Sequence, residues 1–407
     1  MSAFQSFYPN ALLLGNGHSV KVYPYSTQLI ESDDIKCVCR ALKSSHLTQG
    51  EITKKFEDTL AQFVGVKYAL ALNSATSALY AAFFALKAKY WSQDSHIFAI
   101  TTPITFVATS NMMLQNGITP IFAAIKENGN INPQSIKEIL QSHPKKDDIK
   151  MIVSVDYGGQ SVDCDEIACI AKEHNLIWVS DSSHSFGGSY KGRRVGGIAD
   201  VSIFSFHAIK PITTAEGGAI MTNDGEIYAL ASKILNHGVI KGEAWEYDCI
   251  HSGFNFRLSE IGAALGLSQL EKIQSFFSKR GEIAKFYDEV FAHNPFFSTM
   301  VRDSHIISSH HLYPIFLQPD LVQKKKEIFA TLHKSGMLVQ VHYRPIYQFS
   351  LYNQLCQKDS LVSKEARECA DRFYNTELSI PCAQNMSLQD ARIVSEVIME
   401  VLKSVVS

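Results

Sequence analysis

Short apolar runs alternate with longer amphipathic stretches over the first two thirds of the chain. An apolar run of roughly four to six residues is typical of a buried strand, and a stretch of roughly ten to fifteen residues with helical spacing of its apolar positions is typical of a helix. Because such strands and helices alternate here, we expect βαβ units and the fold class α/β, with a mostly parallel central sheet flanked by helices. The pattern predicts strands at 68–72, 97–101, 120–123, 150–155, 176–180, 201–205 and 218–222, and helices at 32–42, 51–63, 75–89, 106–115, 133–142 and 164–173.

The pattern changes after residue 273, where a long helix is expected to run to about residue 291. The elements predicted beyond it are strands at 312–317 and 338–341 and helices at 321–334, 363–373 and 388–402. This order is typical of a smaller α+β domain. Residues 1–24 have no clear period and are expected to form a loose arm. We therefore expect an N-terminal arm at 1–24, a large domain at 25–273 and a small C-terminal domain at 274–407.

The composition excludes several classes of protein. Of the 407 residues, 46% are apolar and 19% are charged, and 38 basic against 40 acidic residues give a net charge of −2. Such a chain offers no basic field for a nucleic acid or an anionic membrane. No apolar run approaches the roughly 18–20 residues that a membrane span needs. The eight cysteines are scattered without CxxC pairs, so we expect reduced thiols in a cytoplasmic protein.

A lysine lies in the connection between two predicted strands. The segment 204–224 reads FSFHAIKPITTAEGGAIMTND, and Lys210 comes five residues after Ser205 and shortly before a pair of glycines. Most loop lysines are solvated, but here the apolar flanks and the glycines favour close packing around the amine. A buried lysine has a lowered pKa, which makes its amine a good Schiff-base nucleophile.

Asp181 comes directly after the predicted strand 176–180. Open α/β sheets bind their ligands at the carboxyl ends of the strands. An aspartate at this place can cap a helix, or it can pair with the protonated ring nitrogen of pyridoxal phosphate. At about 4 Å and an effective dielectric constant near 20, that ion pair is worth roughly 4 kcal/mol, which is enough to keep the ring nitrogen protonated.

Residues 72–79 (LNSATSAL) lead a predicted strand directly into a helix through small hydroxylated side chains. Ser74, Thr76 and Ser77 can cap that helix, and the same geometry presents free backbone N–H groups to a phosphate. Each of these signals is modest when taken alone. A phosphate cradle, a carboxylate at a strand end and a lysine, in this chain order, together indicate an enzyme that uses pyridoxal phosphate.

From about residue 23 to its C-terminus, the sequence resembles the fold type I aminotransferases, which use pyridoxal phosphate. Among these it is similar to the sugar-nucleotide aminotransferases of the DegT/StrS type. The resemblance rests on the Lys210 segment and on the motifs SHLTQG (45–50), NSATSAL (73–79), TTPITFVATSN (101–111), SVDYGGQ (154–160), SDSSH (180–184), GFNFRLSEI (253–261) and VHYRPIYQ (341–348).

The resemblance implies a role at the cofactor for each matching residue. Lys210 is implied as the catalytic lysine that binds the cofactor and moves the proton, and Asp181 as the catalytic partner of the ring nitrogen. Phe106 is expected to stack on the ring and His184 to lie near its phenolate oxygen, although Phe106 could also be a plain core residue. The residues expected to bind the phosphate are Ala75, Thr76 and Ser205, together with Asn255 from the neighbouring subunit.

The resemblance also implies the substrates and the assembly. The amino donor is expected to be L-glutamate, and the acceptor a UDP-linked 4-keto sugar. Because Asn255 is expected to act across a subunit boundary, we expect a homodimer with shared active sites, although Asn255 could also cap a helix near Ser259. No metal is expected, since His310 and His311 are merely adjacent. The residues implied to line the sugar pocket are Tyr25, Ser45, His46, Leu47, Thr48, His342, Tyr343, Arg344 and Pro345.

Two departures and three alternatives remain open. Phe254 stands where the family commonly has a tyrosine, and Ser45 and His46 stand where longer polar side chains are known. The acceptor could instead be another nucleotide-linked 4-keto sugar, of the bacillosamine or perosamine type. The chain could also be a regulatory protein that binds the cofactor without turnover, or a purely structural protein. The presence of Lys210 together with Asp181 disfavours these last two readings.

Overall fold

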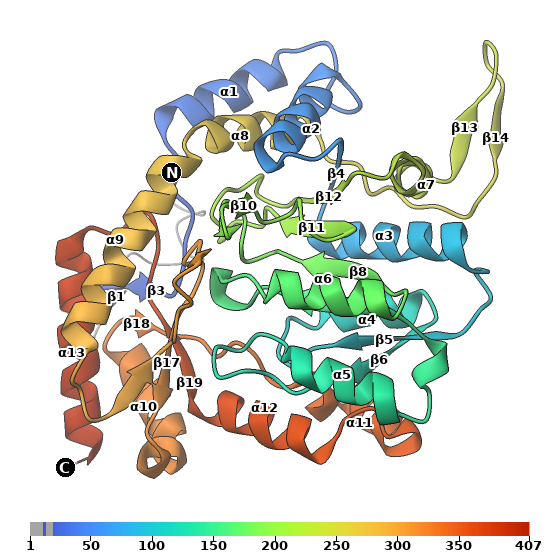
Figure 1. Cartoon of the computed structure of the whole chain (residues 1–407). Helices are drawn as coiled ribbons and strands as arrows, with labels where there is room; N and C mark the ends of the chain where they lie inside the picture. Colours follow the sequence, from blue (N-terminus) through green and yellow to red (C-terminus); the bar gives the residue numbers. More distant parts are fainter. Residues whose placement is uncertain (1–10, 14–18, 407) are drawn as a thin grey trace.

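The computed structural model describes residues 11–13 and 19–406, and its centre is a seven-stranded sheet (Figure 1). Strand β12 runs antiparallel to both of its neighbours, whereas β11, β8, β7, β5 and β6 pair in parallel. The mostly parallel sheet expected from the sequence is therefore confirmed. In spatial order the strands are β4 (Tyr68–Leu72), β12 (Gly218–Thr222), β11 (Val201–Ser205), β8 (Ile177–Asp181), β7 (Ile149–Val155), β5 (Ile97–Thr101) and β6 (Ile118–Phe122).

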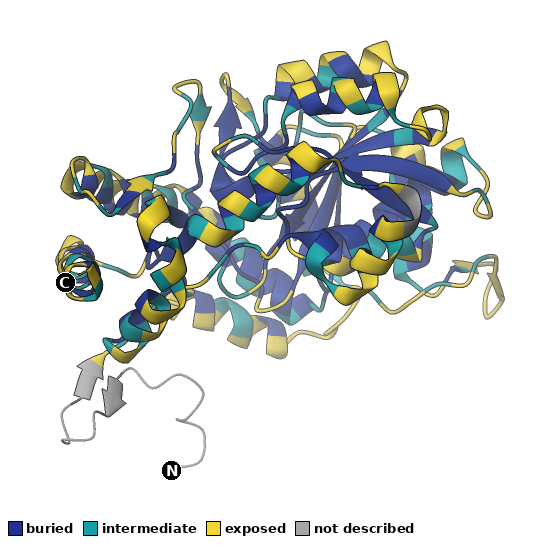
Figure 2. Ribbon diagram, turned by 90° about the horizontal axis from the view of Figure 1, so that it is seen from below, coloured by how far each residue is buried: buried dark blue, intermediate teal, exposed yellow. Residues whose placement is uncertain are grey.

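These strands read as continuous apolar runs because helices cover both faces of the sheet. Every residue of β5, β6, β11 and β12 is buried, and Figure 2 shows the strands as a dark interior between partly exposed helices. A sheet that is buried on both faces has no alternation of polar and apolar positions. The helices in this part of the chain are α1 (Ser32–Leu42), α2 (Glu51–Val64), α3 (Ala75–Tyr90), α4 (Ala108–Gln115), α5 (Pro133–Ser142), α6 (Cys164–Glu173), α7 (Gly225–Leu235) and α8 (Glu260–Glu271).

Helices α4 and α7 show the more informative differences from the sequence prediction. Helix α4 begins at Ala108 rather than at residue 106, and Phe106 stays in the preceding loop with 59% of its surface exposed. Helix α7 is missing from the prediction, because Asn-Asp-Gly at 223–225 has the composition of a turn. In the structure Asp224 caps this helix, since its side chain accepts hydrogen bonds from the backbone N–H groups of Glu226 and Ile227.

A second, smaller sheet lies beside the large one, with the antiparallel order β15 (Phe297–Thr299), β17 (Tyr313–Leu317) and β19 (Glu377–Ile380). It shares an apolar cluster with α9 (Ile273–Phe291), α10 (Lys325–Lys334) and α13 (Leu388–Val406). The helix predicted at 321–334 is divided, because its first part belongs to a 3₁₀ helix, η3 (Pro319–Lys324). The sequence missed β19, although it belongs to the core of this sheet.

The part of the chain between residues 346 and 376 returns to the large sheet. Helices α11 (Ser350–Asp359) and α12 (Lys364–Thr376) lie beneath it in Figure 1, and Tyr347, Tyr352 and Phe373 share one apolar cluster with Phe122 of β6. In sequence these residues belong to the predicted small domain, which begins at 274, yet they pack on the sheet of the predicted large domain. The limits at 24 and 273 stay a prediction.

The N-terminal segment is more ordered than a loose arm where the structure describes it. Strand β1 (Ala11–Leu13) pairs with β2 (Ser19–Lys21), and β3 (Tyr23–Pro24) pairs in parallel with β18 (Met337–Leu338). The prediction of a loose arm is wrong for these residues, and for residues 1–10 and 14–18 it lies outside the described chain. Only Met337 and Leu338 pair with β3, so the strand predicted at 338–341 is shortened to β18. Gln340 bridges to Ser379 instead.

The remaining strands form two small sheets. A hairpin of β13 (Val239–Lys241) and β14 (Tyr247–Cys249) extends away from the body in Figure 1, and Trp245 at its turn is 87% exposed. The other short strands are β9 (Ser189–Tyr190), β10 (Arg193–Arg194) and β16 (Ile306–Ile307). Over the described residues, no helix is both long enough and apolar enough to cross a membrane.

Candidate active site

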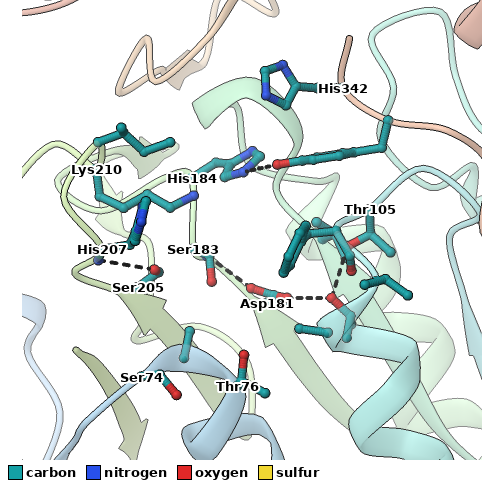
Figure 3. Close-up of a pocket in the computed structure, with 18 of the residues that line it drawn as sticks. Ser74, Thr76, Thr105, Asp181, Ser183, His184, Ser205, His207, Lys210 and His342 are labelled. Atoms are coloured by element: carbon teal, nitrogen blue, oxygen red, sulfur yellow. Dashed lines mark hydrogen bonds between the residues drawn. The ribbon is translucent and has the colours of Figure 1, made fainter. Parts of the chain in front are cut away.

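A cavity of about 630 Å³ opens at the carboxyl ends of β7, β8 and β11. The start of α3, the loop before α4 and the connection from β11 to β12 form one side of it, and residues 340–344 with Tyr25 form the other. The carboxyl edge of an open α/β sheet is where such folds bind ligands. Figure 3 shows that Lys210 and Asp181 point into this space from different elements.

Lys210 lies in the connection between β11 and β12, and its side chain is almost completely buried. Its Nζ atom is 3.3 Å from Nε2 of His311. Loss of hydration lowers the pKa of Lys210 to about 7; the Asp181 carboxylate opposes this shift, and the Arg280 guanidinium adds to it. A substantial fraction of this amine is therefore unprotonated at neutral pH and can act as a nucleophile.

Asp181 is the last residue of β8 and is buried at the floor of the cavity. One carboxylate oxygen accepts a hydrogen bond from the Thr109 hydroxyl at 2.7 Å, and the other accepts one from the backbone N–H of Ser183 at 3.2 Å. These two donors fix the orientation of the carboxylate. Thr109 is a residue that the sequence analysis did not single out, because nothing in its own segment marks it as a partner of Asp181.

The first turn of α3 faces the cavity through Ala75 and Thr76. Ser74 caps the helix by accepting a hydrogen bond from the backbone N–H of Ser77, so the capping role considered for it is confirmed. The other N–H groups of a first turn have no partner within the helix. The start of α3 packs closely on β12, and Gly218 makes this possible. A Cβ atom at Gly218 would lie 2.4 Å from the backbone nitrogen of Ala75. The result is an anion-binding helix end beside the Ser205 hydroxyl.

His184 lines the cavity and is buried. Burial lowers its pKa well below the usual value, and the charge of Lys210 adds to this effect, so the ring is neutral. Its Nδ1 accepts from the backbone N–H of Gly158 at 3.3 Å, so Nε2 carries the hydrogen and donates to the Tyr343 hydroxyl at 3.0 Å. This bond, drawn in Figure 3, joins the β8 end of the site to residues 342–344.

The opposite wall consists largely of aromatic side chains. The rings of Tyr25 and His342 are 4.8 Å apart, and the rings of Phe106 and Tyr343 are 6.2 Å apart. Arg344 also lines the cavity, donates to the Gln348 carbonyl and lies 5.2 Å from the ring of the neighbouring Phe349. This wall offers flat apolar faces and one guanidinium cation.

Several predicted site residues lie outside the cavity of their own chain. Asn255 bridges to Asn236, and its carbonyl accepts from the Asn73 side chain at 3.3 Å. Residues 45–48 form the turn between α1 and α2, where Thr48 bridges to Ser259. In the described structure the predicted residues that do not line the cavity are Ser45, His46, Leu47, Thr48, Asn255 and Pro345.

The sequence analysis treated His311 only as the neighbour of another histidine, whereas the structure places it against Lys210. It is 1% exposed, and its ring lies 4.5 Å from that of His184. Its Nδ1 atom is buried without a hydrogen-bond partner among the described residues. The signal available in the sequence was two polar rings directly before the apolar strand β17.

Away from these residues, Asp163, Asp303 and His305 bring three possible metal-ligand atoms within 4.8 Å of one another in the described part of the chain. They are half-buried or exposed, and they already have partners. Lys126 pairs with Asp163 at 2.7 Å, and His305 pairs with Asp303 at 2.7 Å. Nothing further at this cluster indicates a metal ion.

The polar groups of the cavity fit the chemistry of pyridoxal phosphate. The helix end at Ala75 and Thr76, with the Ser205 hydroxyl, suits a phosphate dianion. The oriented Asp181 carboxylate suits a protonated ring nitrogen, and the buried amine of Lys210 suits an aldehyde. The residues of the cavity therefore offer partners for the phosphate, the ring nitrogen and the aldehyde of this cofactor.

Comparison with known proteins gives consistent results. The model of the DegT/DnrJ/EryC1/StrS aminotransferase family matches residues 28–399. The UDP-4-amino-4,6-dideoxy-N-acetyl-beta-L-altrosamine transaminases of Campylobacter jejuni (strain 81-176) and Helicobacter pylori are each 43% identical, over 94% and 95% of this chain and 98% and 99% of theirs.

Solved structures agree with these sequence matches. Helicobacter pylori PseC, described as an aminotransferase involved in the biosynthesis of pseudoaminic acid, superposes with a TM-score of 0.88 and 42% identity, over 94% of this chain and 100% of its own. The PLP form of Spr1654 from Streptococcus pneumoniae superposes with a TM-score of 0.84 and 26% identity, over 95% and 100% of the two chains.

Proposed function

The chain belongs to the DegT/DnrJ/EryC1/StrS aminotransferase family and uses pyridoxal phosphate, and on that premise we propose that it moves the amino group of L-glutamate to C4 of a UDP-linked 4-keto sugar. The acceptor is UDP-2-acetamido-2,6-dideoxy-β-L-arabino-hexos-4-ulose. The product is UDP-4-amino-4,6-dideoxy-N-acetyl-β-L-altrosamine, an intermediate of pseudaminic acid synthesis. The 43% identity to two transaminases of that name, over almost the whole of both chains, carries this proposal.

In this proposal the residues at the sheet edge hold the cofactor. Ala75, Thr76 and Ser205 bind its phosphate, and Asp181 pairs with its ring nitrogen. Phe106 covers the ring from the loop before α4, where its exposed face is free to do so. His184 lies at the phenolate side, where its neutral ring adds no charge.

Bound pyridoxal phosphate supplies an electron sink for the carbanion and carries the amino group between the two substrates. Lys210 would move the protons: in the glutamate half its unprotonated amine would remove the α-proton and pass it to the carbonyl carbon of the cofactor. In the sugar half the same amine would take a proton back from that carbon and deliver it to C4 of the sugar. The pKa of about 7 suits both tasks, because each protonation state is well populated at neutral pH. Thr109 and Ser183 keep the Asp181 carboxylate aimed while charge develops beside it.

The wall formed by Tyr25 and residues 342–345 recognises the nucleotide sugar. The aromatic rings of Tyr25, His342 and Tyr343 suit the apolar faces of a deoxysugar, and Arg344 supplies a cation for the diphosphate. We also place the protein in the cytoplasm, and its eight free cysteines are in keeping with that compartment.

A homodimer completes the site in this proposal. Residues 45–48 and Asn255 lie outside the cavity of their own chain, so we place them in the cavity of the partner subunit, where Asn255 reaches the phosphate. Apolar side chains that a second copy would cover are exposed on the hairpin β13–β14 and on α1 and the turn after it. They are Ile240, Trp245, Tyr247, Ile35, Leu42 and Leu47.

The shared site is tested by mixing two inactive variants. Lys210→Ala and Asn255→Ala are purified separately, dissociated together and allowed to reassociate. If Asn255 acts across the interface, half of the dimers are mixed, and each of these has one intact site of two, so about a quarter of the native activity returns. No recovery, from dimers shown by light scattering and tagged pull-down to have exchanged subunits, would place Asn255 in its own chain's site.

The acceptor is tested by absorbance spectroscopy on the purified holoenzyme. L-glutamate should bleach the visible absorbance of the bound cofactor, and after removal of the donor the L-arabino keto sugar should restore it. Recovery only with a D-configured keto sugar would move the protein to a pathway of the bacillosamine or perosamine type. If glutamate never bleached the absorbance, transfer from glutamate would be wrong, and a protein that binds the cofactor without turnover would be favoured.

A further inference from the structure

His311 occupies a position beside Lys210 that the proposed roles do not use. Its Nε2 atom is 3.3 Å from Nζ of Lys210, and its ring packs against that of His184. The residue precedes β17, which belongs to the smaller sheet, whereas Lys210 belongs to the large one. The contact joins the two parts of the molecule behind the cavity.

The His311 ring is neutral, so it can accept a hydrogen bond. Burial lowers its pKa well below the usual value, and the nearby charges of Lys210 and Arg280 lower it further. A protonated ring would have no lone pair to offer and would repel the ammonium form of Lys210. The amine carries N–H groups in both of its protonation states, so Nε2 of the neutral ring is its acceptor.

The backbone of His311 is held in place by Arg280 of α9. This guanidinium is fully buried, and its Nη1 donates to the carbonyls of His310 at 3.2 Å, His311 at 3.3 Å and Cys382 at 2.7 Å. These bonds restrain the backbone of His311, while its buried ring packs against that of His184. Contacts other than the one to Lys210 therefore help to set the position of Nε2.

The other ring nitrogen indicates that this arrangement serves more than packing. With Nε2 as the acceptor, the hydrogen lies on Nδ1, which is buried without a partner among the described residues. A buried, unpaired donor costs free energy that an apolar side chain of similar size would not. A purely structural position would not require an imidazole.

We propose that His311 is the positioning residue of Lys210. Nε2 of His311 accepts a hydrogen bond from the Lys210 amine whenever that amine is not bonded to the cofactor. This bond holds the amine at the edge of the cavity and directs the lone pair of the amine into the cavity. The catalytic part of this inference rests on the proposed aminotransfer. The contact itself does not, because it exists in the protein alone.

Two substitutions separate the hydrogen bond from the volume of the side chain. His311→Leu fills much of the space but offers no acceptor, whereas His311→Gln keeps a neutral acceptor. The matched control is His310→Asn. In the described structure the His310 side chain makes no hydrogen bond to Lys210, and its backbone has a positive φ of 48°, a conformation that asparagine tolerates. Thermal unfolding and cofactor stoichiometry confirm that each variant folds and loads.

The first readout needs no turnover. Trace acetylation of the cofactor-free protein at a series of pH values, followed by peptide mass spectrometry, gives the pKa and the reactivity of Lys210. We expect His311→Leu to lower that pKa by about one unit, because the acceptor that stabilises the ammonium form is lost, and His311→Gln to leave it within a few tenths. An unchanged pKa in His311→Leu would overturn the proposal.

The second readout is the half-reaction of the holoenzyme with glutamate. We expect His311→Leu to slow it about tenfold and to raise the isotope effect of α-deuterated glutamate, while His311→Gln stays within about threefold of the native rate. Equal losses in both variants would reduce His311 to a structural role. If the native protein does not respond to glutamate at all, the proposed function fails, and the acetylation result still decides the contact.

Discussion

The two walls of the cavity are held in place by different means. On one side, Asp181, Ser205 and the start of α3 are extensions of buried strands, and the backbone ladder of the large sheet places them. On the other side, residues 342–344 lie in no strand or helix, and buried side chains hold them. In the proposed function the sheet wall serves the cofactor chemistry and the loop wall sets the sugar specificity, and the His184–Tyr343 hydrogen bond is a direct contact between them.

Glu377 of β19 is the centre of the network behind the loop wall. Its carboxylate is fully buried and accepts from the backbone N–H of His342 at 2.8 Å and from the Ser379 hydroxyl at 2.5 Å. Ser379 in turn accepts from Nδ1 of His342, and the Tyr157 hydroxyl donates to the His342 carbonyl at 2.7 Å. Burial raises the pKa of Glu377 to about 7, and these donors together with Lys325 oppose the shift.

The largest effect is expected when the sheet wall is broken. Lys210→Ala should reduce both half-reactions by about 10³- to 10⁴-fold, because the proton donor and acceptor is lost. The dissociation constant of the nucleotide sugar should change by less than about threefold, because the loop wall is intact. Stopped-flow absorbance and calorimetry measure these two quantities.

The control for that experiment is Lys191→Ala, which removes an exposed lysine that pairs with Asp165. It should leave both measurements unchanged. A loss of sugar binding in Lys210→Ala as large as the loss of rate would show that the two walls are not independent.

A smaller effect is expected from Glu377→Gln, and it should fall on sugar binding rather than on the glutamate half-reaction. The amide nitrogen cannot accept from His342 or Ser379, so one or two buried hydrogen bonds are lost and the loop wall loosens. We expect the KM for the nucleotide sugar to rise about tenfold, while the glutamate half-reaction stays within about twofold of the native rate. Glu365→Gln, at an exposed position on α12, is the matched control. An equal fall in the glutamate half-reaction would contradict the division into two walls.

The smallest expected effect concerns stability and pH. The unfolded chain keeps the Lys210 proton up to a pH near 10.5, whereas the folded, cofactor-free protein loses it near pH 7. Between these values the unfolded state binds more protons, so the free energy of unfolding contributed by this group rises with pH, by at most about 1.4 kcal/mol per pH unit. Below pH 7 both states are protonated, so this group no longer makes the free energy of unfolding depend on pH.

Lys210→Met removes the pH-dependent contribution of this lysine to the free energy of unfolding. Urea unfolding of the cofactor-free proteins at pH 7, 8 and 9 should therefore show a steeper gain in stability for the native chain than for the variant. Parallel curves would mean that the folded pKa of Lys210 lies near its ordinary value, and that the sheet wall does not activate this amine by burial.

Much of the fold was predictable because local pattern determines it. The strands at 97–101, 201–205 and 218–222 and the helices at 133–142 and 164–173 have the predicted limits, since a continuous apolar run or a helical period is a property of neighbouring residues. Some of the errors occur where the partners are distant. The strand predicted at 338–341 ends early because Gln340 bridges to β19, and the N-terminal strands form by pairing that their own composition does not indicate.

The sequence by itself determined the α/β sheet, the lysine after one strand, the aspartate at the end of another and the hydroxylated start of a helix, because each depends on neighbours in the chain. Tertiary structure alone decided which groups serve them. Thr109 meets Asp181 across 72 positions, and His311 meets Lys210 across 101. No local pattern encodes such a meeting, because it depends on how the sheets and helices pack and on which groups lose their water when they do.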